Sequence, residues 1–221
     1  MIRTARVIEA VVFDLDGVIV SSEEVWDEVR EALTRERGGW WVPEAHRRMM
    51  GMSTSEWAAY MRDELGVPMT QEEIVSEVER RLIARYERDL PLIPGAVDTV
   101  CALSARYPLG LASSSTRVLI AAVLRLAGLT AHFRVTVSSE EVPRGKPAPD
   151  VYLRALELLG VAPAGAVAVE DSTAGIRAAA AAGMRVVAIP NRIYPPEPEA
   201  LALADVVLER IADLTPETLP A

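Results

Sequence analysis

Cysteine, histidine and positive charge are all scarce in this chain. Its 221 residues include one cysteine, two histidines, and 23 lysine and arginine residues against 32 aspartate and glutamate residues. The single Cys101 excludes an intrachain disulfide, which fits a reducing compartment, and we expect its side chain to be a small apolar part of the core. A net charge of −9 argues against nucleic-acid binding, because phosphate backbones are bound by clustered lysine and arginine.

Long apolar segments are also missing. No run approaches the ~20 residues of a membrane-spanning helix. Glu9 and Asp14 interrupt the N-terminal segment, where a signal peptide would need an apolar stretch. These absences predict a soluble cytoplasmic protein that binds neither membranes nor nucleic acid, and we expect a monomer or a weak homodimer.

The chain does contain a regular alternation of short apolar runs and helical patterns. We expect strands at residues 7–14, 109–113, 135–138, 166–169, 186–189 and 206–208. Helical patterns lie between most of them, at residues 96–106, 117–127, 149–159 and 174–182. This alternation predicts an α/β fold with a Rossmann-like parallel sheet flanked by helices.

One long interval breaks the alternation. It holds four amphipathic helical patterns, at residues 23–37, 44–50, 55–65 and 72–88, and no convincing strand. We therefore predict an α-helical cap at 21–91, inserted into a Rossmann-like catalytic core of residues 1–20 and 92–221. Because ligands bind at the carboxyl ends of parallel strands, a cap inserted after the first strand would act as a lid over the site.

The most informative segment is the first apolar run, Val-Val-Phe, which leads directly into Asp14-Leu-Asp16-Gly17. An ionised aspartate is costly to bury without partners, so packing does not explain two of them at a strand end. The segment therefore predicts the negatively charged floor of an active site.

Three further strand ends carry polar residues. Ser113–Ser115 follow the second strand, Lys146 lies in a Gly-Lys-Pro turn after the third, and Glu170-Asp171 follow the fourth. Hydroxyl groups and free N–H groups at the start of the helix after Ser115 favour an anion, and Lys146 supplies a positive charge. These groups around an aspartate suit phosphoryl transfer, in which the aspartate can be a covalent nucleophile.

Four carboxylates meeting at one sheet edge would repel each other and keep some of them protonated. A divalent cation resolves this repulsion, and oxygen ligands with room for water suit Mg²⁺, which takes about six of them. His46 and His132 lie far apart in the sequence and in no metal motif, so zinc is not indicated.

In this order, the motifs resemble those of the haloacid dehalogenase-like hydrolases. The matching segments are Asp14-Leu-Asp-Gly-Val, Ser113, Lys146-Pro147, and Glu170-Asp-Ser-Thr-Ala-Gly-Ile. The helical insertion is similar to the cap of the subgroup that contains β-phosphoglucomutase and phosphoglycolate phosphatase.

The resemblance implies a role for each residue. Asp14 would attack phosphorus, and Asp16 would protonate the leaving alcohol and then activate water. Mg²⁺ would be held by Asp14, the Asp16 carbonyl and Asp171, with Glu170 as a ligand or through its water shell. The remaining residues would bind phosphate: Ser113, Ser114 and Lys146.

Departures from the family pattern bear on the reaction. Asp16 argues against dehalogenation, and a cap without lysine argues against the phosphonoacetaldehyde hydrolases. A β-phosphoglucomutase-like mutase stays open as an alternative, although Thr54 occupies the place of the arginine that binds the distal phosphate there. Ser21 replaces an aspartate that many relatives carry, which puts their usual contact between hinge and core in doubt.

The sequence thus predicts a Mg²⁺-dependent phosphatase of a small phosphomonoester, with a sugar phosphate as the expected substrate. His46, Thr54 and Trp57 of the cap are the candidate substrate contacts. A non-enzyme alternative is a phospho-accepting signalling module, which would become phosphorylated at Asp14 without turnover.

Overall fold

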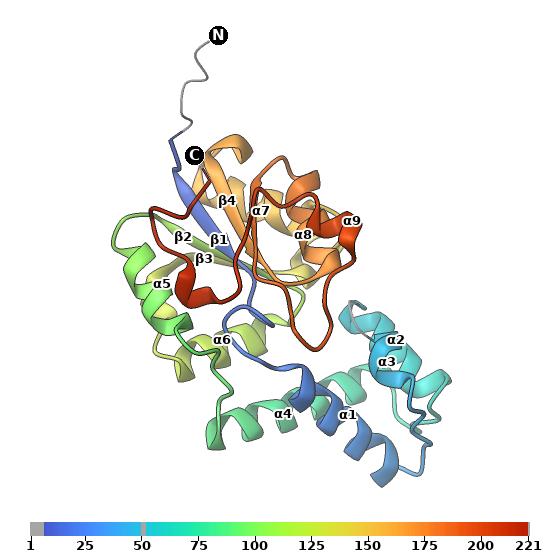
Figure 1. Cartoon of the computed structure of the whole chain (residues 1–221). Helices are drawn as coiled ribbons and strands as arrows, with labels where there is room; N and C mark the ends of the chain where they lie inside the picture. The colour runs from blue at the N-terminus through green and yellow to red at the C-terminus, as the bar shows by residue number, and fades with distance from the viewer. Residues whose placement is uncertain (1–6, 50–51, 221) are drawn as a thin grey trace.

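The computed structural model describes residues 7–49 and 52–220, and the architecture below concerns these residues (Figure 1). The predicted core begins at residue 1, so its first six residues lie outside this range. Residue 50, the expected end of the second helix of the insertion, also lies outside it.

The centre of the molecule is a six-stranded sheet in the order β3-β2-β1-β4-β5-β6, and every neighbouring pair is parallel. The strands are β1 (Ala10–Phe13), β2 (Leu109–Ser113), β3 (Phe133–Ser138), β4 (Ala166–Glu170), β5 (Arg185–Ala188) and β6 (Val206–Val207). The central strands β1, β2 and β4 are apolar except for Ser113 and Glu170 at their carboxyl ends, because both faces of a parallel sheet are covered. Each of the six expected strands is present, and this confirms the predicted α/β fold.

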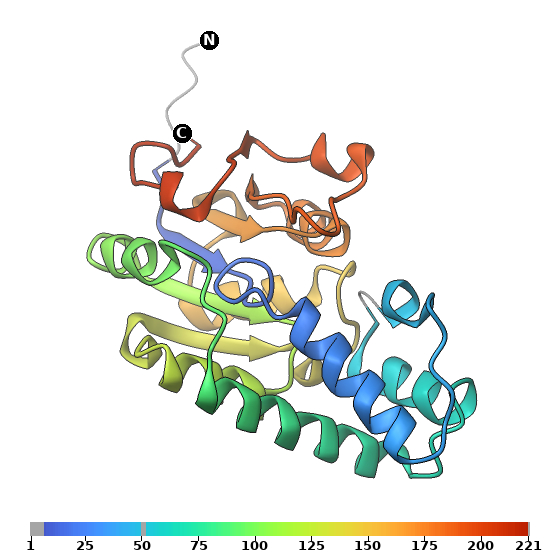
Figure 2. The ribbon, with the colours of Figure 1, turned by 60° about the horizontal axis from the view of Figure 1, so that its bottom comes forward.

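Side chains of successive strand residues enter opposite faces of the sheet. Phe13 packs on the face covered by α5 (Ala96–Ser104) and α6 (Arg117–Leu126). Val12 packs on the face covered by α7 (Asp150–Leu159) and α8 (Thr173–Ala181). Figure 2 shows the parallel strands between these helices. A short helix, α9 (Pro198–Leu201), precedes β6 and was not expected from the sequence.

The first strand is shorter than expected, since it begins at Ala10 and not at residue 7. Val7 is 77% exposed and contributes no buried surface. Glu9 is held to Gly165 by one backbone hydrogen bond of 2.8 Å.

Four helices occupy the predicted insertion, which we call the helical insert and define as residues 21–91. They are α1 (Glu23–Glu36), α2 (Ala45–Met49), α3 (Thr54–Asp63) and α4 (Gln71–Arg88). Capping boxes start two of them, formed by Ser53 with Glu56 and by Thr70 with Glu73. The apolar core of the insert is continuous with the Phe13 face of the sheet.

The two chain segments that join the insert to the sheet run side by side. Ser21 N–H donates to the carbonyl of Pro91 at 2.8 Å, and Ile93 N–H donates to that of Ile19 at 2.9 Å. Thr116, which caps α6, donates a hydrogen bond to Glu79 of α4. These contacts hold the insert beside the carboxyl ends of the strands (Figures 1 and 2).

Two expectations from composition can be compared with the described residues. None of their helices is both long and apolar enough to cross a membrane. Cys101 lies on α5 and packs, partly buried, against the core, with its Sγ 3.6 Å from Nε2 of His132.

The shared core predicts that the insert contributes to global stability. Leu82 on α4 is fully buried, so Leu82→Ala should lower the free energy of unfolding by about 2–5 kcal/mol. Leu158→Ala on α7, where the side chain is 47% exposed, is the control and should cost less than about 1 kcal/mol. Urea unfolding measures both, and equal effects would contradict this assignment of the core.

Candidate active site

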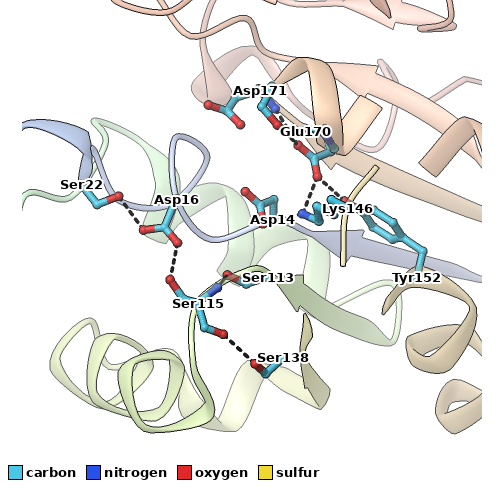
Figure 3. Close-up of polar contacts among 12 residues, drawn as sticks. Asp14, Asp16, Ser22, Ser113, Ser115, Ser138, Lys146, Tyr152, Glu170 and Asp171 are labelled. Atoms are coloured by element: carbon cyan, nitrogen blue, oxygen red, sulfur yellow. Dashed lines mark hydrogen bonds and ion pairs between the residues drawn. The ribbon is translucent and has the colours of Figure 1, made fainter. Parts of the chain in front are cut away.

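The polar residues that follow four strands meet at one edge of the sheet, as expected for parallel strands (Figure 3). Asp14 follows β1, Ser113 ends β2, Lys146 follows β3, and Glu170 ends β4. Strand β1 lies between β2 and β4. The chain adds β2 and β3 on one side of β1 and then β4, β5 and β6 on the other side. This is the position at which open α/β sheets form a ligand-binding crevice.

Lys146 connects the two carboxylates at the centre of the site. Its Nζ lies 2.7 Å from Oδ1 of Asp14 and 2.6 Å from Oε1 of Glu170. The hydroxyl of Tyr152 donates to the same Glu170 oxygen at 2.6 Å. Lys146 is the only lysine in the 221 residues, and its peptide bond to Pro147 is cis. The lysine predicted to bind phosphate is therefore fixed by ion pairs on two sides.

Burial and charge set the protonation of these groups. Burial, with help from Glu170 and Asp16, raises the pKa of Asp14 to about 8, although Lys146 acts to lower it. Burial alone would lower the pKa of Lys146, but Asp14 and Glu170 outweigh it and raise that pKa above its ordinary value. The lysine is therefore charged at neutral pH, while the nucleophile candidate needs further positive charge to stay ionised.

Glu170 is fully buried. Besides Lys146 and Tyr152, its carboxylate accepts the backbone N–H of Asp171 at 3.2 Å and the hydroxyl of Ser172 at 3.3 Å. These four donors fix the Glu170 carboxylate, which in turn orients the ammonium group of Lys146.

Asp171 and its surroundings fit a hard cation. One carboxylate oxygen each from Asp14, Glu170 and Asp171 lies within 4.8 Å of the others. Burial and the charges of Glu170 and Asp14 raise the pKa of Asp171 well above its ordinary value. Buried carboxylate oxygens with no nitrogen or sulfur ligand among them match the preference of Mg²⁺. The donor set therefore fits the cofactor expected from the sequence.

Asp16 points away from Lys146 and toward two hydroxyl groups (Figure 3). Ser22 donates to its Oδ1 at 2.5 Å and Ser115 donates to its Oδ2 at 2.7 Å. The Ser115 backbone is fixed in turn, because its N–H donates to Ser113 Oγ at 3.0 Å and its carbonyl accepts from Ser138 at 2.8 Å. The serine cluster thus orients the second aspartate.

Two glycines allow the carboxylates to approach the backbone. A Cβ atom on Gly17 would lie 1.9 Å from Oδ2 of Asp171, and one on Gly175 would lie 1.9 Å from the carboxylate of Glu170. Gly17 also has φ of +80°, which other residues rarely adopt. Both positions therefore require glycine in the described geometry.

A cavity of about 660 Å³ lies between the sheet edge and the helical insert. Among the residues predicted from the sequence, those lining it are Asp14, Asp16, His46, Thr54, Trp57, Ser114, Lys146 and Asp171. Ser113 and Glu170 are fully buried beneath this group and do not line the cavity. The structure thus brings the predicted core residues and the predicted residues of the insert to one space.

Sequence reasoning missed four residues of this region: Ser22, Arg30, Tyr152 and Asn191. Ser22 precedes a helix and has the pattern of an ordinary cap, but its hydroxyl is bonded to Asp16. Asn191 lies in a loop, where its amide donates to Asp171 at 3.2 Å and also to Glu23. No local motif marks these positions, because their roles depend on how distant segments meet.

Comparisons with known proteins match most of this chain. The family model for haloacid dehalogenase-like hydrolases matches residues 8–183. Hexitol phosphatase B of Escherichia coli (strain K12) is 34% identical over 222 residues, covering 98% of this chain and 98% of that protein. A phosphorylated carbohydrates phosphatase of Thermotoga maritima is 31% identical over 217 residues, covering 96% and 100%.

A solved structure agrees with these matches. A mutant of CbbY from Rhodobacter sphaeroides, in complex with xylulose-(1,5)bisphosphate, superimposes with a TM-score of 0.85 at 29% sequence identity. The match covers 97% of this chain and 100% of that one.

The close approach at Gly175 predicts an unusual response to alanine. Alanine favours a helix over glycine by about 1 kcal/mol, and Gly175 lies within α8. The Cβ atom would nevertheless displace the Glu170 carboxylate, so Gly175→Ala should destabilise the protein by about 1–3 kcal/mol. Thermal unfolding measures the effect, and a stabilised variant would contradict the geometry.

The raised pKa values predict how stability depends on pH without metal. The folded state keeps protons on Asp14 and Asp171 that the unfolded chain has released, so the free energy of unfolding should fall between about pH 5 and about pH 8. Urea unfolding in EDTA measures this slope, and Asp14→Asn should flatten it. A stability that rises over the same interval would contradict the assignment.

Proposed function

Because the chain belongs to the haloacid dehalogenase-like hydrolases, we propose that it is a Mg²⁺-dependent phosphatase that cleaves small phosphomonoesters through an aspartyl-phosphate intermediate. The observation that carries this proposal is the pairing of Asp14 with Lys146 at the floor of the cavity. A carboxylate held by a buried cation at the cavity surface is placed to act as a nucleophile.

Asp14 attacks phosphorus with the carboxylate oxygen that Lys146 does not occupy. The phosphorus–oxygen bond to the alcohol breaks, and phosphate is carried as an acyl phosphate on Asp14. Lys146 neutralises charge that builds up on the phosphate oxygens, and Glu170 and Tyr152 keep the ammonium group in place. Ser114, which lines the cavity next to Lys146, offers further donors to the phosphate.

Asp16 moves the proton. It protonates the leaving oxygen in the first step and takes a proton from the attacking water in the second. The hydroxyls of Ser22 and Ser115 hold its carboxylate beside the cavity. Hydrolysis of the acyl phosphate then restores Asp14, which separates this reaction from the stable phosphorylation of a signalling module.

Asp14 and Asp171 would hold Mg²⁺, together with the Asp16 carbonyl, and Glu170 would assist as a ligand or through the water shell of the ion. When bound, the ion supplies positive charge that keeps Asp14 ionised and draws the phosphate toward it. The raised pKa values of Asp14 and Asp171 support this assignment, because a neighbouring cation would favour the ionised form of both carboxylates.

We assign residues 1–20 and 92–221 to the catalytic core and residues 21–91 to a cap that covers the substrate. The cavity between the sheet edge and the insert supports this division, and so do the paired linkers at Ser21 and Ile93. His46, Thr54 and Trp57 would contact the substrate from the cap and exclude water when it closes. A cytoplasmic location stays a prediction.

The names of the relatives favour phosphorylated sugars or sugar alcohols as substrates. A mutase is the second candidate, because a putative β-phosphoglucomutase from Thermotoga maritima superimposes with a TM-score of 0.73 at 28% identity. Thr54 starts α3 where that reaction would need an arginine, which favours hydrolysis.

The test is phosphate release from a panel of sugar and polyol phosphates, with Mg²⁺ and with EDTA. We expect Mg²⁺-dependent release that Asp14→Asn reduces by at least about 10³-fold, because the variant lacks the nucleophile. Its circular dichroism and thermal unfolding should show an intact fold. Near-normal turnover by this variant would contradict the mechanism, and isomerisation of β-glucose 1-phosphate without phosphate release would favour the mutase.

A further inference from the structure

Arg30 is a buried cation that the proposed chemistry does not use. It lies on α1 and its side chain is among the most buried charged groups, with 8% of the residue exposed. Its Cζ lies 4.3 Å from the ring centroid of Trp26 and 4.7 Å from that of Trp57. Burial lowers the pKa of Arg30 to about 10, so the guanidinium group is charged at neutral pH.

Among the residues that the structure describes, none offers an oxygen that bonds to the guanidinium group. Its Nε is buried without a hydrogen bond, and none of the ion pairs within 7–49 and 52–220 includes Arg30. The indole rings attract the positive charge but offer no oxygen to its N–H groups. A buried charge without such a partner is costly, so the folded chain gains no evident stability from this arrangement.

The two carboxylates whose charges act on Arg30 have other partners. Asp27 lies 2.9 Å from Nδ1 of His46 and accepts a hydrogen bond of 3.4 Å from Tyr194. Asp16 accepts from the hydroxyls of Ser22 and Ser115. Within residues 7–49 and 52–220, no hydrogen bond or ion pair joins either acid to the guanidinium group.

Arg30 lines the same cavity as Asp14 and Asp16, but from the side of the helical insert. A ligand whose phosphate lies at Asp14 would extend from the sheet edge toward Trp26, Arg30 and Trp57. The volume of about 660 Å³ falls in the range of small-molecule sites. Arg30 thus lies beside the part of such a ligand that does not react.

We propose that Arg30 binds an oxyanion, either a carboxylate or a second phosphate, at the end of the substrate remote from the reacting phosphate. The planar fork of N–H donors on a guanidinium group matches both anions, whereas a neutral hydroxyl would leave the buried charge uncompensated. The proposal rests on the proposed function and narrows its substrates to phosphomonoesters that carry a second anionic group.

Three ligands with one carbon skeleton test this proposal: glucitol 6-phosphate, gluconate 6-phosphate and glucitol 1,6-bisphosphate. The first is neutral at C1, the second carries a carboxylate there and the third a phosphate. We expect kcat/KM to be about 10- to 100-fold higher for at least one of the two anionic ligands, as a charge-assisted hydrogen bond provides. Arg30→Met should remove this preference, chiefly through KM, so that kcat/KM for the favoured anionic ligand falls to about that for glucitol 6-phosphate.

Arg35→Met is the matched control, because Arg35 lies on the same helix, is paired with Glu31 and does not line the cavity. It should leave the preference unchanged, and Arg30→Lys should retain part of it. Thermal unfolding checks that each variant is folded. Equal losses for all three ligands in Arg30→Met would assign Arg30 to packing between the tryptophans and overturn the proposal, as would a wild-type protein without preference for either anion.

Binding separates this proposal from the proposed function. Calorimetry on Asp14→Asn measures the affinity of the three ligands without turnover. Tighter binding of an anionic ligand that Arg30→Met abolishes, with no hydrolysis by the wild type, would support the role of Arg30 and contradict the phosphatase. Hydrolysis of glucitol 6-phosphate with equal affinities for all three ligands would contradict the role of Arg30 alone.

Discussion

The ion pairs of Lys146 with Asp14 and Glu170 are the interaction on which the site depends. Two carboxylates and one ammonium group meet with little exposure to solvent, so removing Lys146 would leave two buried carboxylates without the cation that they share. The neighbouring features follow from this constraint. Tyr152 and Ser172 supply donors to Glu170, and the glycine at 175 leaves room for its carboxylate.

The sheet makes this arrangement achievable. Asp14, Lys146 and Glu170 are far apart along the chain, but each follows a strand that ends at the same edge. Parallel strands of similar length align their ends, so no separate folding element is needed to collect the groups. The helical insert leaves from the same edge, which is why Trp26, Trp57 and Arg30 lie across one cavity from the acids of the core.

The fold and the centre of the site could be predicted because both are marked by short segments of the sequence. Short apolar runs mark buried parallel strands, and acids that follow them stand out because burial penalises charge, so Asp14 and Glu170 were identifiable. The family predicted from these motifs is confirmed by the match over residues 8–183. Tyr152 and Arg30 were not identifiable, because each occupies a helical position whose sequence pattern is that of ordinary core or surface. Their importance depends on tertiary contacts with Glu170 and with Trp26, which no spacing rule encodes.

All of the lysine and arginine residues of this protein are arginines except one. The exception, Lys146, is also the cation that cannot be exchanged for a guanidinium group without changing its fit, because a compact ammonium group lies within 2.7 Å of two different carboxylates. Chemistry directed at lysine side chains, such as acylation or reductive methylation, therefore has a single target in the whole chain. The rate of that modification at Lys146 in intact protein therefore depends on how often its ion pairs with Asp14 and Glu170 open and release a neutral amine.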